Sequence, residues 1–76
     1  MSENINMKAK AQRIKWVLTI MERTNKMEYI KLIAIIEMNF GASTETAKEY
    51  IQTCINAGCL GKENGNVIYI TKDYGA

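Results

Sequence analysis

The chain has 76 residues, of which 47% are hydrophobic and 24% charged, and a formal net charge of +2. This length and composition predict one small folded domain and leave no room for a second. The sequence contains no His, one Asp and two Ser, which excludes a Ser-His-Asp triad and a zinc site of the Cys₂His₂ type. We therefore expect a protein that is not an enzyme and that uses no metal, cofactor or small-molecule substrate.

The hydrophobic pattern predicts a cytoplasmic protein with no membrane segment. The longest apolar stretch, residues 32–36, is far too short to span a bilayer, and the N-terminus has no apolar signal-peptide core. In a reducing compartment, Cys54 and Cys59 are expected to be free thiols that pack as small hydrophobes. A disulfide between them, or a thiol switch, stays open as an alternative.

Residues 1–6 are polar and show no periodicity, so we expect a flexible N-terminal tail there. Good helix formers without Gly or Pro follow from residue 7 to about residue 23, with Asn6 as the N-cap. The helical period places one row of apolar residues toward the core, consisting of Met7, Ala11, Ile14, Val17, Leu18 and Met21.

Two further helices are predicted around a very short turn. The first runs from about residue 27 to residue 39 and ends before Gly41, the residue type that most readily takes a positive φ. The second covers residues 44–57 and has Ser43 as its N-cap. The predicted core faces are Tyr29, Ile33, Ile36 and Phe40 in the first of these helices, and Ala47, Tyr50, Ile51, Cys54 and Ile55 in the second.

The hydrophobic period then changes from that of a helix to that of a strand, which indicates a β-hairpin. Residues 59–62 and 67–71 are the predicted strands, and Asn64-Gly65 between them is the strongest short signal for a hairpin turn. The residues that we expect to share one face of the hairpin and to cover the helices are Leu60, Ile68 and Ile70.

Two stretches carry a resemblance to a known family. Residues 40–51 read FGASTETAKEYI, and residues 57–60 read AGCL. In an order of three helices and a hairpin, these stretches resemble the turn, the start of the recognition helix and the link to the wing in the winged helix-turn-helix family. The resemblance covers residues 7–72, between the expected tails at residues 1–6 and 73–76. It implies a small α+β winged helix-turn-helix domain.

The resemblance also implies a protein that binds double-stranded DNA, as a transcription regulator or a chromatin-associated factor. In this family the third helix reads the major groove, and the wing touches the DNA backbone or the minor groove. Carried over onto this sequence, the contacts from the third helix and its cap would be Ser43, Thr44, Glu45, Thr46, Lys48, Glu49 and Gln52. The wing would contribute Lys62, Asn64 and Asn66, and the first helix could add backbone contacts from Lys10 and Arg13.

The cationic side chains lie mainly outside that predicted reading surface. Residues 1–31 carry a net charge of +4, and residues 32–76 carry a net charge of −2. Cations neutralise phosphates in a DNA complex, but the outer side of the third helix offers two Glu for one Lys. The basic residues of the first helix either contact a nucleic-acid backbone or are solvated flanks of an amphipathic helix.

Four apolar side chains have no place in the predicted core. On the first helix they are Trp16 and Ile20, and on the second helix they are Ile35 and Met38. Exposed Trp residues are enriched at binding hot spots, so these residues predict a protein interface, either in a homodimer or with a partner protein. Burial within the monomer is the alternative. A winged-helix module that binds protein is therefore the second function that the sequence supports.

Overall fold

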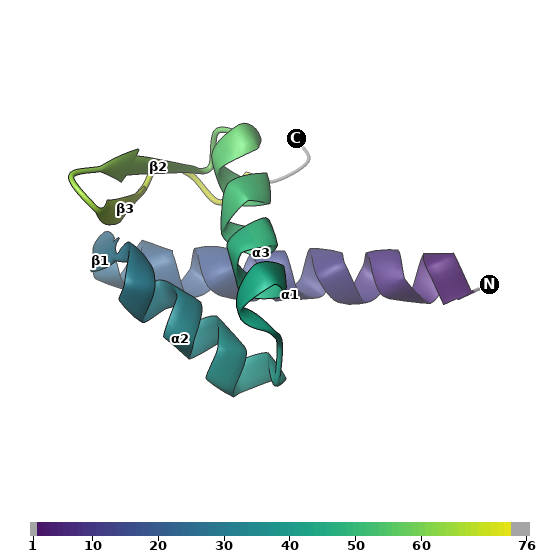
Figure 1. Cartoon of the computed structure of the whole chain (residues 1–76). Helices are drawn as coiled ribbons and strands as arrows, with labels where there is room; N and C mark the ends of the chain where they lie inside the picture. Colours follow the sequence, from purple (N-terminus) through teal and green to yellow (C-terminus); the bar gives the residue numbers. More distant parts are fainter. Residues whose placement is uncertain (1, 74–76) are drawn as a thin grey trace.

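The computed structural model describes residues 2–73, with side chains from residue 9 onward, and shows an α+β fold (Figure 1). Its elements in chain order are α1 (Ser2–Thr24), β1 (Lys26–Glu28), α2 (Tyr29–Phe40), α3 (Thr44–Asn56), β2 (Leu60–Glu63) and β3 (Asn66–Tyr69). The strands form one antiparallel sheet in the order β1-β3-β2. The helices and the β2–β3 hairpin, which we call the wing, give the winged-helix-like topology that the sequence predicts.

α1 is longer than the sequence analysis predicts. It begins at Ser2, whereas the prediction was a tail over residues 1–6 with Asn6 as the N-cap. No Gly or Pro interrupts the first 24 residues, so nothing in the local sequence delays the start of the helix. α1 packs against α3 and the sheet, and its N-terminal turns extend beyond the rest of the domain (Figure 1). Apart from Asp73, the expected C-terminal tail lies outside the described residues.

The strand β1 is the element that the sequence analysis does not predict. The apolar pattern predicts a helix from Met27, but residues 26–28 pair with β3, and Met27 lies opposite Val67. Asn25 turns the chain after α1 with a φ of 65°, and its carbonyl accepts a hydrogen bond from the backbone N of Tyr69 at 2.8 Å. Pairing with a strand far along the chain decides the conformation here, because tertiary context overrides the weak local preferences of three residues.

The turn between α2 and α3 and the turn of the wing follow the sequence prediction. Gly41 takes a φ of 65° directly after α2, and Ser43 caps α3 by accepting a hydrogen bond at its Oγ from the backbone N of Thr46, at 3.2 Å. At the wing tip, Asn64 and Gly65 have φ values of 51° and 80°, as a type I′ hairpin turn requires. The predicted cap, chain reversal and hairpin are confirmed.

The wing covers the helices with a different set of residues from the predicted one. Leu60 is buried as predicted, and it pairs with Tyr69 across the wing. Because side chains alternate along a strand, Val67 and Tyr69 share the face of Leu60. Ile68 and Ile70 therefore lie on the outer face, where Ile70 is 55% exposed. The prediction that these two isoleucines cover the helices is wrong, because the register across the turn sets which residues face inward.

The core lies where the helices meet the inner face of the sheet. The predicted rows of α1 and α3 are buried, with Ala11 and Ile55 only partly so, and the side chain of Met7 lies outside the described residues. The buried residues are Ile14, Val17, Leu18, Met21, Leu32, Ile33, Ile36, Ala47, Tyr50, Ile51, Cys54, Cys59, Leu60 and Val67. Over the part of the chain that the structure describes, no helix is both long and apolar enough to cross a membrane.

Candidate functional site

The outward side of α3 and the start of α2 border an open, shallow polar hollow of about 460 Å³. Residues three, four and seven positions apart lie on one face of a helix, and this spacing gathers Glu45, Lys48, Glu49 and Gln52 on the outward side of α3. The complete lining is Tyr29, Glu45, Thr46, Lys48, Glu49 and Gln52, and we call it the α3 hollow. All of the lining residues except Tyr29 belong to the set that the resemblance singles out on α3.

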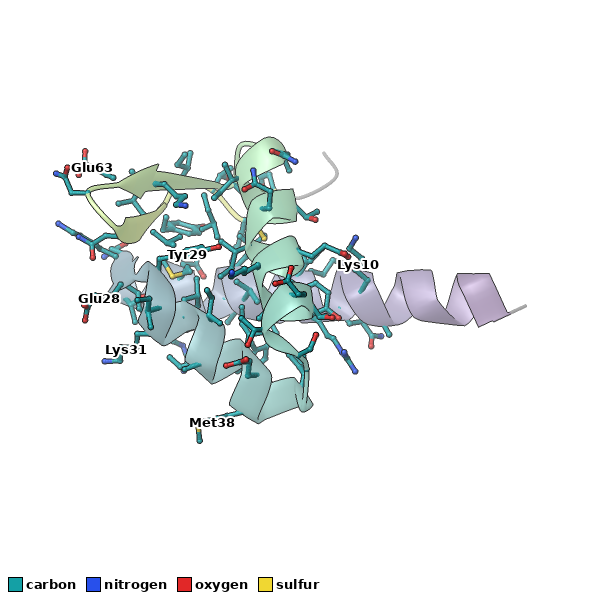
Figure 2. The ribbon with its side chains drawn as sticks, viewed as in Figure 1. Lys10, Glu28, Tyr29, Lys31, Met38 and Glu63 are labelled. Carbon is teal, nitrogen blue, oxygen red and sulfur yellow. The ribbon has the colours of Figure 1, made fainter. Side chains whose placement is uncertain are left out.

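Tyr29 ties the wing to the α3 hollow. Its backbone N donates a hydrogen bond to the carbonyl oxygen of Gly65 at 3.0 Å, which joins the start of α2 to the wing tip. The Nζ atom of Lys62 lies 4.2 Å from the centre of the Tyr29 ring, a cation–π contact. Figure 2 shows Tyr29 between the wing and α3. Lys62 therefore lies at the edge of the hollow, although it belongs to a different element.

Tyr29 is a residue of the hollow that the sequence pattern does not indicate. The helical period assigns it to the core face of α2, and part of its ring does pack against the core. Because Tyr29 is the first residue of α2, its ring reaches past the end of the core and stays half-buried. Its position beside the wing depends on the pairing of β1 with β3, for which the sequence carries no clear signal.

Several polar side chains at the start of α3 form hydrogen bonds within the protein. Ser43 caps the helix, and its Oγ also donates to Oγ1 of Thr46 at 3.0 Å. Oγ1 of Thr44 donates a hydrogen bond to Oε2 of Glu37, near the end of α2. The bond from Thr44 holds the start of α3 against α2. Of the three hydroxyl residues that the resemblance names, only Thr46 lines the hollow.

Lys10 of α1 reaches the same surface. Its Nζ lies 3.0 Å from Oε1 of Glu49 in an ion pair whose two side chains are 41% and 63% exposed. Figure 2 shows Lys10 projecting beside α3. The pair offsets the charge of one carboxylate that lines the hollow.

Arg13 lies in the seam between the helices and does not line the α3 hollow. Its Nη1 donates a hydrogen bond to Oη of Tyr50 at 3.1 Å, and its Cζ lies 5.0 Å from the centre of the Phe40 ring. The side chain is half-buried. Arg13 thus joins α1 to both α2 and α3.

The three predicted wing residues lie in different places, and only one of them is beside the α3 hollow. Lys62 lies beside the hollow through its contact with Tyr29. Asn64 is exposed at the wing tip, and Asn66 is half-buried between Glu28 of β1 and Glu63 of β2. Neither asparagine lines the α3 hollow, so the wing brings one predicted side chain to it.

The charges around the hollow nearly cancel. The cationic groups on this side are Lys10, Lys48 and Lys62, and the anionic groups are Glu45 and Glu49. A polyanion would meet little long-range attraction from such a surface. Short-range hydrogen bonds from Thr46, Lys48 and Gln52 are the main means of recognition that the hollow offers.

A second surface lies between α1 and α2. The rings of Trp16 and Phe40 pack edge to face, with centres 5.1 Å apart and an interplanar angle of 75°. Beside them is an apolar groove of about 330 Å³ lined by Trp16, Ile35, Met38 and Asn39, which we call the α1–α2 groove. Three of the four predicted interface residues thus meet in one place. The fourth, Ile20, lies one turn after Trp16 on α1 and is partly buried.

Both cysteines are free thiols that are buried in the core, as predicted. Burial, with a smaller contribution from nearby Cys59, raises the pKa of Cys54 to about 12. Burial also raises the pKa of Cys59, with a contribution from Asp73. Because the thiolate is the reactive form of cysteine, the raised pKa values and the burial make both residues unreactive packing groups.

Comparison with known proteins finds no match for this chain, whether among protein-family models, curated proteins or solved structures. The inferences that follow therefore rest on the geometry and chemistry described above.

Proposed function

We propose that the chain is a winged helix-turn-helix protein that binds double-stranded DNA through the α3 hollow and the wing, as a transcription regulator or a chromatin-associated factor. The observation that carries the proposal is the grouping of Thr46, Lys48 and Gln52 on the outward side of a capped helix, beside a wing that brings Lys62 to the same hollow. An α-helix fits the major groove of B-DNA, where its side chains reach the edges of the bases.

Each of these side chains has a chemical role that suits DNA. Lys48 can bind a phosphate or the acceptor atoms of guanine, and Gln52 can pair with adenine. Thr46 can donate to a phosphate, and Lys62 can reach the DNA backbone from the wing. Glu45 and Glu49 repel phosphates but can accept a hydrogen bond from the amino group of cytosine. Because these carboxylates offset the lysines, we expect weak binding to random DNA and a larger contribution from base contacts at a preferred site.

We further propose a cytoplasmic location, which the free thiols of Cys54 and Cys59 support. Thiols persist in reducing compartments, whereas exported proteins are commonly oxidised to disulfides.

The proposal predicts a shallow dependence of DNA binding on salt. Titration of the protein into a labelled random-sequence duplex, followed by fluorescence anisotropy, should give a slope of log K against log salt of about −2 to −3, because each neutralised phosphate contributes about −0.9. Lys48→Glu should weaken binding about tenfold or more, since it places a carboxylate against the phosphates. Lys15→Glu makes the same change of charge at an exposed position of α1 outside the α3 hollow, and it should change the affinity much less.

Two results would contradict this proposal. One is the absence of binding at low salt both to random DNA and to a pool of duplexes selected for affinity. The other is unchanged binding by Lys48→Glu together with loss of binding by Lys10→Glu, which would move the DNA-binding surface from α3 to α1.

A further inference from the structure

α2 is apolar on almost every side. Only three of its twelve residues are charged or carry an amide: Lys31, Glu37 and Asn39. One face packs into the core through residues such as Leu32 and Ile36. A helix that is apolar all round is normally covered on all sides, yet no described element covers the outer side of α2.

The uncovered side of α2 is a row of exposed apolar residues. Ile30, Ala34 and Met38 are spaced four residues apart and therefore lie on one face of the helix. Ile30 is 79% exposed and Met38 is 86% exposed. Figure 2 shows Met38 pointing outward from α2, away from α3 and the wing.

This row continues into the α1–α2 groove, because Met38 belongs to both. The groove has an aromatic wall, since Trp16 packs edge to face against Phe40. We call the groove together with Ile30 and Ala34 the α1–α2 face. Its long apolar row beside a groove between two helices is the arrangement that accepts an amphipathic helix.

Cations flank one end of the α1–α2 face. Arg23 follows Trp16 by seven residues on α1, and Lys31 precedes Ile35 by four residues on α2, so each lies on the same side of its helix as the apolar residue. Both cations are exposed, and within residues 9–73 neither forms an ion pair. Figure 2 shows Lys31 and Met38 projecting outward from α2.

Among the described side chains of α1 and α2, both carboxylates have partners away from this face. Glu22 pairs with Lys72 at 3.4 Å on the side of α1 that meets the sheet. Glu37 accepts the hydrogen bond from Thr44 on the side of α2 that meets α3. Glu28, the residue before α2, is exposed three residues before Lys31, and Figure 2 shows the two side chains at the same end of α2. With Arg23 and Lys31 against Glu28 at this end, the α1–α2 face combines apolar surface with a net positive charge.

We propose that the α1–α2 face binds an amphipathic helix of a partner protein, with the apolar side of that helix along α2 and in the groove and with its acidic residues opposite Arg23 and Lys31. A second copy of this chain is a poorer occupant, because its own α1–α2 face carries the same net positive charge and like charges across an interface are repelled. This surface is separate from the α3 hollow, so the proposal does not depend on DNA binding.

The test uses Trp16, the only Trp in the sequence, as a fluorescent reporter. The probes are two synthetic amphipathic peptides without Trp that share one row of Leu and differ only in the charged side, which is Glu in one and Lys in the other. The Glu peptide should shift the Trp16 emission to shorter wavelength with a saturating curve, and it should bind about tenfold more tightly than the Lys peptide, because like charges across an interface are repelled.

Two exposed substitutions make the test specific. Met38→Glu should abolish the shift, and Lys31→Glu should remove or invert the preference for the Glu peptide, while Lys48→Glu on α3 should change nothing. Circular dichroism checks that each variant is folded. Met38 and Lys31 are exposed in the monomer, so neither substitution removes a buried side chain from the core.

Three results would overturn this inference. They are the lack of a saturable shift with either peptide, equal affinity for the two peptides, and binding that Met38→Glu leaves intact. A molar mass that rises with protein concentration in light scattering, and that Met38→Glu returns to the monomer value, would instead assign the face to a second copy of the chain.

Discussion

Arg13 shows how the partners of a single residue decide its role. In the sequence it belongs to a basic helix, and this concentration of positive charge makes it a candidate for contact with a DNA backbone. In the structure its guanidinium lies over Phe40 and donates to Tyr50. Its charge therefore lies between α1, α2 and α3. A cation–π contact and a hydrogen bond at a partly buried site stabilise packing, and we therefore assign Arg13 chiefly to the fold.

Replacement of Arg13 by Met should separate these two roles. Arg13→Met keeps an unbranched apolar stem but removes the hydrogen bond and the cation–π contact, so the free energy of unfolding should fall by about 1–2 kcal/mol. Urea unfolding followed by circular dichroism measures this change. Affinity for random duplex DNA should change less than it does in Lys48→Glu. If Arg13→Met left the stability unchanged but abolished DNA binding, Arg13 would be a residue of the DNA-binding surface instead.

At the scale of the elements, the start of α3 is fixed by two neighbouring residues, Ser43 and Gly41. Ser43 satisfies the backbone N of Thr46, one of the donors that a helix N-terminus leaves without a partner inside the helix. Gly41 reverses the chain just before it with a positive φ. Because the cap also sets the direction in which α3 leaves the turn, it positions the α3 hollow as well as stabilising the helix.

Loss of this cap should be measurable in the intact protein. Ser43→Ala should lower the free energy of unfolding by about 1 kcal/mol, as is typical for removal of an N-cap side chain. Ser43→Asp is the matched control, because Asp is an equally good N-cap. Equal stability of the Ala and Asp variants in urea unfolding would show that the cap contributes nothing here.

Over the whole molecule, the tertiary structure rearranges the charges that the sequence divides into a basic and an acidic part. The ion pair between Lys10 and Glu49 joins the two parts and lowers the negative charge of the α3 hollow. Both side chains are well exposed, so the pair contributes at most about 1 kcal/mol to stability. Its main effect is on the electrostatic potential of the surface that we propose for DNA.

Removal of the Glu49 charge should therefore change binding much more than stability. Glu49→Gln removes a carboxylate from the hollow and releases Lys10, so the affinity for random duplex DNA should rise and the slope of log K against log salt should steepen by about 1. Anisotropy titrations at several salt concentrations measure both quantities. Lys15→Gln is the control for a change of one charge away from the hollow. An affinity and a slope that equal those of the parent protein would place Glu49 outside the contact surface.

The sequence by itself determined the features that depend on neighbouring residues. The helical rows of α1, α2 and α3 predict most of the core because the period of a helix is a local property. The Ser43 cap and the Asn64-Gly65 turn are equally local, since each is decided by the conformational and hydrogen-bonding preferences of one or two residues. The α+β class and the order of the main elements follow from these signals.

Only the tertiary structure decided what depends on contacts between distant segments. β1 exists because residues 26–28 meet β3, and the inner face of the wing is Val67 and Tyr69 because Leu60 pairs with Tyr69. The positions of Tyr29 and Lys10 beside the α3 hollow, and the alignment of Trp16 with Met38 along one groove, have the same origin. Strand register and the rotation of one helix against another are set by packing across the whole domain, and a periodic pattern within one segment does not contain that information.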